Sequence, residues 1–279
     1  MILMPKAKIN LGLYILRRRP DGYHDVATVM VPIGWSDVLE VVPSATGVTT
    51  LTVSGRAVDC PTEKNLVIKA YRALKAVVAD LPPADIYLHK IVPDGAGLGG
   101  GSADAAATIV GLNEVFNLGL SIERMQTVAA TVGADCPFFI RCEPALATGT
   151  GTTLAEAAVP GIEGMAITVA KAKTESVPTA QAYAGVTPCD RPTDGLLADL
   201  ARHPRLWSAS NMCNDFEPHI MQLRPEIRRV KDAMTAGGAC YGAMSGSGAA
   251  VFGLFDDMAA ATAVADTLSA WCDTWCGTL

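Results

Sequence analysis

The chain has 279 residues, 50% of them hydrophobic and 18% charged, which is enough apolar sequence for a large core without disulfides or metal. Its 22 basic and 28 acidic residues give a net charge of −6, which argues against a general nucleic-acid binder, since such proteins usually present a basic face. Eight cysteines without a C-x-x-C pair, no signal-peptide pattern and no long apolar run predict a cytoplasmic protein with reduced thiols.

Strands dominate the beginning of the chain. The segments expected to form them, rich in alternating or β-branched residues, are residues 9–16, 26–33, 38–42 and 49–53. Asp21 and Gly22 mark a tight turn between the first two strands. A helix is expected after Pro61, because the apolar residues between Leu66 and Val78 recur at the 3.6-residue spacing of one helix face. A further strand over residues 86–92 leads into a glycine-rich loop.

The glycine-rich loop, residues 93–107, runs into an alanine-rich helix that extends to about Phe116. Its glycines allow positive φ angles and a close approach of the backbone to a ligand. Ser102 is expected to cap the helix, and Asp104 to complement the helix dipole. Because backbone amides and the positive end of a helix dipole attract anions, the loop predicts a phosphate site.

The second half of the chain mixes helices and strands. A helix capped by Ser121 ends near Gly133, and residues 136–140 are expected to form a strand. A Thr/Gly stretch at residues 148–153 predicts a boundary between domains 1–152 and 153–279. A strand is expected at 165–170, and an irregular segment follows at 171–212. A helix at 216–236 then leads to a second glycine loop at 244–249 and a strand at 250–255. The last expected element is a helix at 257–271, capped by Asp256.

Several kinds of protein bind phosphate through glycines. Residues 95–100 satisfy G-x-G-x-x-G, the dinucleotide fingerprint, but a second helix follows where an acidic strand end should hold the ribose. An oxidoreductase is therefore weakly supported. The P-loop of nucleotide hydrolases is excluded because no Gly-Lys-Ser or Gly-Lys-Thr follows the glycines. The H-R-D and D-F-G motifs of protein kinases are absent from the sequence.

Three polar residues fit phosphoryl transfer. Lys8 and Asn10 lie two apart in the first strand and so share a face, and Asp135 follows the second of the two helices after the glycine loop. An ammonium beside a carboxylate stabilises its ionised form, which can take the proton of an alcohol that attacks phosphorus. With the phosphates held by the loop, catalysis would depend on positioning and charge neutralisation.

Several segments together resemble the GHMP kinases. Four of them are residues 5–12, 19–24, 93–107 and 244–248, and three more are 133–138, 177–183 and 214–217. The resemblance implies an α+β fold of two subdomains with the active site in the cleft between them. It also implies transfer of the ATP γ-phosphate to the 2-hydroxyl of a methylerythritol linked to cytidine diphosphate. Asp135 would be the general base, and Lys8 would neutralise charge.

The resemblance also assigns the binding residues. Asn10 would contact the substrate near the acceptor hydroxyl, Tyr23 and Tyr183 would sandwich the cytosine, and His24 would recognise the edge of the base. The residues that would bind ATP are Asn65, Pro93, Gly95, Ala96, Gly97, Leu98, Gly99, Gly100, Gly101, Ser102 and Ala103. Mg²⁺ is expected with ATP, and the sequence assigns it no ligands.

Two alternatives within the same scaffold remain open. One is another GHMP kinase, acting on homoserine or mevalonate, and Tyr23, His24 and Tyr183 weigh against it because those substrates offer no base to stack. The other is a catalytically silent nucleotide-binding protein, against which Lys8 and Asp135 weigh. The expected partners are ATP and a small-molecule substrate, without nucleic acid or membrane, for a monomer or weak homodimer.

Overall fold

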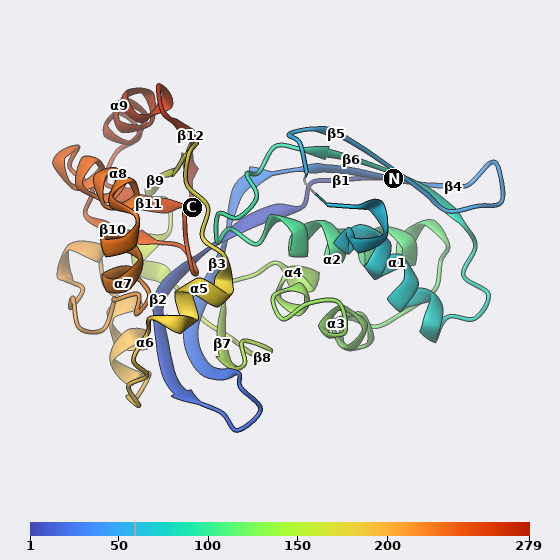
Figure 1. Cartoon of the computed structure of the whole chain (residues 1–279), viewed down its shortest axis with the longest axis horizontal. Helices are drawn as coiled ribbons and strands as arrows, with labels where there is room; N and C mark the ends of the chain where they lie inside the picture. Colours follow the sequence, from blue (N-terminus) through green and yellow to red (C-terminus); the bar gives the residue numbers. More distant parts are fainter. Residues whose placement is uncertain (59) are drawn as a thin grey trace. The chain divides into compact units, whose positions relative to one another are not determined.

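A computed structural model describes residues 1–58 and 60–279 and divides the chain into two compact units (Figure 1). Unit 1 comprises residues 1–7, 35–94 and 99–143, and unit 2 comprises residues 8–34, 95–98 and 144–279. The chain therefore passes from one unit to the other and back within the glycine-rich loop. In the part of the chain that is described, no helix is both long and apolar enough to cross a membrane.

Unit 1 is built on a four-stranded sheet in the order β1-β4-β6-β5. These strands are β1 (Ile2–Leu3), β4 (Val38–Pro43), β5 (Thr50–Gly55) and β6 (Ala84–Lys90). Strands β5 and β6 run parallel, and the other neighbours are antiparallel. Helices α1 and α2 lie along the same face of this sheet (Figure 1). The core between sheet and helices is apolar, with Val41, Leu74 and Ile86 fully buried.

The helices of unit 1 are η1 (Thr62–Lys64), α1 (Leu66–Val77), α2 (Gly100–Val115), α3 (Ile122–Ala130) and α4 (Cys136–Arg141). Helices α1, α2 and α3 confirm the three expected helices, and η1 is a separate short turn before α1. The strand predicted at residues 136–140 is wrong, since this segment is α4. Pro137 lies in the first turn of that helix, where its fixed φ is favourable and its missing N–H has no consequence. A five-residue apolar run carries too little periodicity to distinguish a strand from a buried helix.

Unit 2 contains a sheet in the order β2-β3-β7-β8. Its strands are β2 (Lys6–Arg18), β3 (His24–Ser36), β7 (Ala145–Gly149) and β8 (Thr153–Glu156). Strands β2 and β3 confirm the strands expected at the N-terminus. The predicted domain boundary at residue 152 falls in the turn between β7 and β8, and unit 2 takes residues from both sides of it.

The second sheet of unit 2 is antiparallel and has the order β10-β11-β9-β12. Its strands are β9 (Ala166–Ala172), β10 (Tyr241–Met244), β11 (Val251–Phe255) and β12 (Cys272–Thr278). Strands β9 and β11 were expected from the sequence, whereas β10 and β12 were not. Helices α8 and α9 pack against this sheet, and residues such as Val230, Phe255 and Ala261 are fully buried in the shared core.

The remaining helices of unit 2 refine the sequence expectations. They are η2 (Pro160–Ile162), α5 (Thr179–Ala184), α6 (Asp194–Leu200), η3 (Pro204–Leu206), α7 (Glu217–Leu223), α8 (Pro225–Ala236) and α9 (Met258–Ser269). The segment 171–212 is thus not wholly irregular. The helix expected over 216–236 is interrupted at Arg224, because Pro225 disfavours a helical residue before it. Asp257, not Asp256, caps α9 by accepting the Ala260 amide at 2.8 Å.

Candidate active site

Lys8 and Asn10 form a buried polar cluster on β2, and both are 3% exposed. The Lys8 ammonium donates to the Asn10 side-chain oxygen at 2.5 Å and to the Gly97 carbonyl at 2.8 Å. The Asn10 amide in turn donates to the Thr28 hydroxyl of β3 at 3.1 Å. The two-residue spacing therefore places both side chains on one face, as the sequence predicts, and joins them to the glycine-rich loop.

The part of the glycine-rich loop in unit 2, residues 95–98, lies against the second glycine loop. The Ser245 hydroxyl donates to the Gly97 carbonyl at 2.9 Å, and the Ala250 amide donates to the Ala96 carbonyl at 3.0 Å. Gly97 has φ +72°, and a Cβ there would collide with the Ser245 carbonyl oxygen. Only glycine fits this position, because both the backbone conformation and the close approach exclude a side chain.

Two residues of the 214–217 segment hold the second glycine loop in place. The buried Asn214 side chain donates to the carbonyls of Met244 at 2.8 Å and Gly246 at 2.9 Å. The Glu217 carboxylate accepts the Met244 amide at 2.6 Å. The resemblance singles out this segment without giving it a role, and the contacts show that it positions the loop that faces Gly97.

The start of α2 in unit 1 differs from the sequence expectation. Ser102 does not cap the helix: α2 begins at Gly100, its N-cap is Gly99 with φ 71°, and no side chain caps it. Burial raises the pKa of the Cys136 thiol to about 11, and the Ser102 hydroxyl partly offsets this shift. With no side chain bonded to them, the first amides of α2 are available to an anion, which supports the predicted phosphate site.

Beneath the same helix lies a buried cluster of three charged residues that sequence reasoning missed. Lys90 donates to the Asp37 carboxylate at 2.5 Å and to the Asp104 carboxylate at 2.8 Å, and all three side chains are at most 3% exposed. Asp37 also accepts the Ile91 and Val92 amides at 2.5 and 2.8 Å. Asp104 was expected to complement the helix dipole, but it lies beyond the first turn of α2 and pairs with Lys90 in the interior.

The cluster contains one basic and two acidic groups, and the pKa values of Lys90 and Asp104 reflect this imbalance. Burial raises the pKa of Asp104 to about 7, with Lys90 opposing the shift and Asp37 adding to it. Burial lowers the pKa of Lys90, but the two carboxylates more than reverse this and leave it above its ordinary value. One ammonium cannot compensate two buried carboxylates, so Asp104 retains a proton close to neutrality.

Asp135 immediately precedes α4 and is half-buried, yet its side chain does not cap that helix. The ordinary structural role of an aspartate at a helix start is therefore not the one it performs. Asp135 belongs to unit 1 and Lys8 to unit 2. Their pairing stays a prediction, as does the role of Asp135 as a base.

Asn65 has a structural role that the sequence did not suggest. It is the N-cap of α1, and its side-chain oxygen accepts the Val67 amide at 2.9 Å. Capping of this kind stabilises a helix by about 0.5–2 kcal/mol. Its contact with ATP stays a prediction.

Two of the three residues expected to bind the base lie together in unit 2. The rings of His24 and Tyr183 stack with centroids 4.8 Å apart and planes 23° apart, and Tyr183 meets Phe216 edge-on at 4.9 Å. Tyr23 is 68% exposed. Burial, and secondarily the charge of Arg18, lowers the pKa of His24, which favours the neutral imidazole. The structure thus presents a stacked aromatic pair and an exposed tyrosine beside it in sequence.

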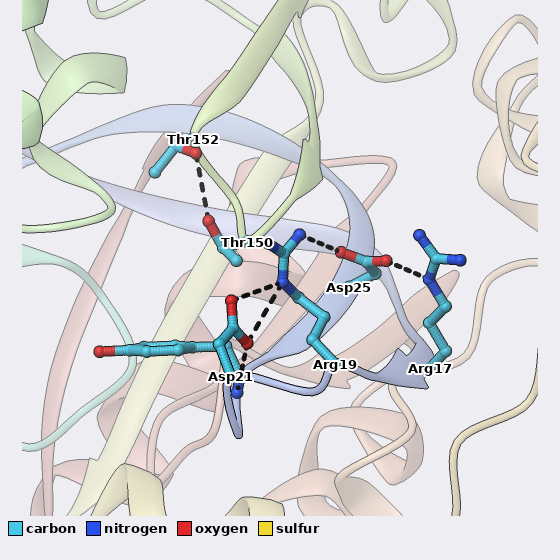
Figure 2. A network of polar contacts seen from close by, with 7 residues as sticks. Arg17, Arg19, Asp21, Asp25, Thr150 and Thr152 are labelled. Atoms are coloured by element: carbon cyan, nitrogen blue, oxygen red, sulfur yellow. Dashed lines mark hydrogen bonds and ion pairs between the residues drawn. The ribbon is translucent and has the colours of Figure 1, made fainter.

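A network of ion pairs fixes the hairpin between β2 and β3 that carries Tyr23 (Figure 2). The Asp25 carboxylate accepts from both Arg17 and Arg19, and Arg19 also pairs with Asp21 at 3.0 Å. Asp21 accepts the Tyr23 amide at 3.1 Å. Arg17 and Arg19 therefore help to shape the turn.

The cysteines and acidic residues bear on metal binding. All eight cysteines are free thiols, as expected. Within residues 1–58 and 60–279, the group of three or more possible ligands that lie close together is His203, Cys240 and Asp256. Mg²⁺ prefers an octahedron of oxygens and usually keeps several waters and substrate phosphates. This group is not a set of carboxylates of the kind that holds Mg²⁺, and the ligands of Mg²⁺ stay unassigned.

Comparison with known proteins gives a consistent result. The model of the GHMP kinases N terminal domain matches residues 65–143, and that of the GHMP kinases C terminal domain matches residues 196–274. The chain is 45% identical to the 4-diphosphocytidyl-2-C-methyl-D-erythritol kinase of Parabacteroides distasonis over 256 residues, 92% of each chain.

Solved structures agree with this similarity. A crystal structure of 4-(cytidine 5'-diphospho)-2C-methyl-D-erythritol kinase superposes with a TM-score of 0.82 at 33% identity, covering 100% of this chain and 98% of that one. Homoserine kinase from Cytophaga hutchinsonii gives 0.74 at 19% identity, covering 98% of this chain and 94% of that one, which shows a shared fold alone.

Proposed function

The chain belongs to the GHMP kinase family, in the branch of the 4-diphosphocytidyl-2-C-methyl-D-erythritol kinases, and from this membership we propose the reaction and the residue roles that follow. It transfers the γ-phosphate of ATP to the 2-hydroxyl of 4-diphosphocytidyl-2-C-methyl-D-erythritol, a step in the non-mevalonate route to isoprenoid precursors. The observation that carries this function is the 45% identity over 92% of both chains.

The chemical step requires a base and a neutralising cation. The 2-hydroxyl oxygen attacks the γ-phosphorus, its proton passes to the Asp135 carboxylate, and ADP leaves with the electrons of the broken P–O bond. Lys8 neutralises charge that builds up on the transferred group, a kind of electrostatic stabilisation worth about 10²–10³ in rate per donor. The proposal is supported by the Lys8 contacts, because Asn10 Oδ1 and the Gly97 carbonyl hold the ammonium at the glycine-rich loop.

Recognition of the cytosine is proposed for the aromatic residues of unit 2. Tyr183 and Tyr23 stack on the base, and His24 recognises its polar edge. The lowered pKa of His24 supports this role, since a neutral imidazole offers one donor and one acceptor to the edge of the base. In the described structure, His24 lies against Tyr183, so binding of the base between the tyrosines requires the His24 ring to move off the Tyr183 face.

The nucleotide and its metal are assigned to the first glycine-rich loop. We propose that residues 93–103 hold the ATP phosphates, with the uncapped start of α2 as the anion site, and that Asn65 lies near the adenosine. Mg²⁺ held with the ATP phosphates at this loop would supply charge neutralisation. The free thiols support a reducing compartment, the cytoplasm, and we propose a monomer or weak homodimer.

The direct test is to incubate the purified chain with ATP, Mg²⁺ and the cytidine-diphosphate alcohol, and to follow ADP release and the position of the new phosphate by phosphorus NMR. We expect one phosphate on the 2-hydroxyl. Asp135→Ala should reduce turnover by about 10²–10⁴-fold while ATP binding persists. Normal turnover of that variant would remove Asp135 as the base, and phosphorylation at another hydroxyl would overturn the proposed reaction.

A further inference from the structure

A cluster of three side chains in unit 2, none of which has a part in the proposed reaction, combines the ligand types of a transition-metal site. The Asp256 carboxylate oxygen Oδ1 lies 2.9 Å from His203 Nε2 and 3.2 Å from Cys240 Sγ. One ligand atom from each residue lies within 4.8 Å of the others. His203 and Asp256 side chains are 43% and 44% exposed, so an ion in solution can reach them.

Two of these residues are placed by the second sheet of unit 2. Cys240 directly precedes β10, and Asp256 directly follows β11, the antiparallel partner of β10. The Cys240 amide donates to the Leu254 carbonyl at 2.7 Å, which extends the pairing of the two strands to this end. Backbone pairing thus holds the thiol and the carboxylate side by side, and the thiol donates to Asp256 Oδ1.

His203 comes from a separate loop that aromatic residues fix to the same sheet. It immediately precedes η3, and the Trp207 indole N–H behind it donates to the Arg202 carbonyl at 2.9 Å. The Trp207 ring meets Tyr241 of β10 edge-on at 5.0 Å, and Tyr241 packs on Phe252 of β11. Three ligands on three rigid segments are the preorganisation that a metal site requires.

We propose that His203, Cys240 and Asp256 bind a divalent metal ion of borderline softness, Zn²⁺ being the best match, with water as the fourth ligand. Thiolate, imidazole and carboxylate are the protein ligands of Zn²⁺, and its bonds of about 2.0–2.3 Å bring tetrahedral ligand atoms to about 3.5 Å from each other. Small side-chain rotations supply that geometry here. As the metal–sulfur bond forms, the Cys240 thiol releases its proton to solvent. The neutral imidazole binds through Nε2 with its proton on Nδ1, so Nδ1 gives up the hydrogen bond that it accepts from the Arg205 amide at 3.3 Å.

Arg205 makes this site distinguishable from an ordinary ion pair. Its guanidinium donates to Asp256 Oδ2 at 2.6 and 3.1 Å, and its positive charge lies beside the position of the metal. A cation next to a cation site weakens binding. If the cluster binds metal, Arg205→Ala must tighten the binding, whereas in a purely structural ion-pair cluster its removal does not create metal affinity.

The test uses the full-length chain with any affinity tag removed, because polyhistidine binds zinc. Zn²⁺ affinity is measured by competition with a chromophoric chelator, and Co²⁺ is used as a spectroscopic probe of thiolate ligation. We expect one Zn²⁺ per chain, and a Co²⁺ thiolate charge-transfer band in the wild type. Cys240→Ser and His203→Ala should abolish the band and weaken Zn²⁺ binding about tenfold or more. Arg205→Ala should strengthen it about fivefold or more.

The matched control is Cys189→Ser, which removes another exposed thiol of unit 2 and should change neither reading. Thermal unfolding gives a second measurement, since an ion that joins the 203–207 loop to β10 and β11 raises Tm in the wild type and not in Cys240→Ser. Zinc binding that survives Cys240→Ser and His203→Ala, a Co²⁺ spectrum without the thiolate band, or no tightening by Arg205→Ala would each overturn the site.

Discussion

Two buried lysines of this chain, Lys8 in unit 2 and Lys90 in unit 1, have the same exposure, 3%, and different surroundings. Lys90 binds two carboxylates, those of Asp37 and Asp104. Lys8 donates to an amide oxygen of Asn10 and to the Gly97 carbonyl, both of them neutral. Both lysines contact the glycine-rich loop of residues 93–107 or the helix that it runs into. Lys90 binds Asp104 in α2, and Lys8 binds Gly97 before that helix.

The difference shows that two buried lysines at the same segment can have different roles, one in fixing its structure and one in the proposed reaction. Lys90 pairs with two carboxylates, and its role is to fix the first turns of α2 to the end of β6. The hydrogen bonds that Lys8 donates to the neutral oxygens of Asn10 and Gly97 orient its ammonium at the glycine-rich loop, as a group that acts on phosphate requires. Lys90 is accordingly a structural residue, and Lys8 is the proposed catalytic one.

The largest effect should come from Lys90→Met. The substitution leaves two buried carboxylates without their cation, which costs about 3–5 kcal/mol when one partner of a buried pair is removed. Urea unfolding measures it, with the exposed Lys69→Met as a control that should stay within about 0.5 kcal/mol of the wild type. A Lys90→Met variant as stable as the control would contradict a structural role for this cluster.

Lys8→Met should act on rate rather than on fold. Loss of one preorganised positive group is expected to lower kcat about 10²–10³-fold. The control is Lys6→Met, an exposed lysine two residues earlier in the same strand, which should keep normal turnover. If Lys8→Met loses stability as severely as Lys90→Met and retains its kcat, the contrast between the two lysines fails.

A smaller effect is expected for Tyr183→Ala. Stacking of an aromatic side chain on a base contributes about 1–3 kcal/mol, so the KM for the cytidine-diphosphate alcohol should rise about 5- to 150-fold while kcat changes little. Tyr183→Phe retains the ring and its packing on Phe216 and should behave nearly as the wild type. An unchanged KM in Tyr183→Ala would remove this residue from the base site.

The smallest effect concerns pH. The pKa of Asp104 is raised from 3.8 to about 7 in the folded chain, so folding favours its protonated form. The resulting stabilisation is present at low pH and is lost as the pH rises through about 7. Between pH 5 and 8 the wild type should lose stability relative to Asp104→Asn, by at most about 1.4 kcal/mol per pH unit. Parallel stability curves from urea unfolding would show that Asp104 binds no extra proton.

The sequence predicted what depends on local pattern. The strand spacing placed Lys8 and Asn10 together, the glycines marked a close backbone approach at Gly97, and helix periodicity located α1 and α2. It could not reveal Lys90 with Asp37 and Asp104, since these residues are 53 and 14 positions apart and meet only through tertiary packing. The strand predicted at residues 136–140 was wrong because a segment buried on nearly all sides lacks the apolar periodicity that distinguishes a helix from a strand.

The central claim is that the chain phosphorylates the 2-hydroxyl of 4-diphosphocytidyl-2-C-methyl-D-erythritol. The most direct measurement offers the enzyme an equimolar mixture of this alcohol, homoserine and mevalonate with labelled ATP and Mg²⁺, and follows the label into each product by mass. The account predicts label in the cytidine-diphosphate alcohol alone. Label in homoserine or mevalonate in its place would contradict it.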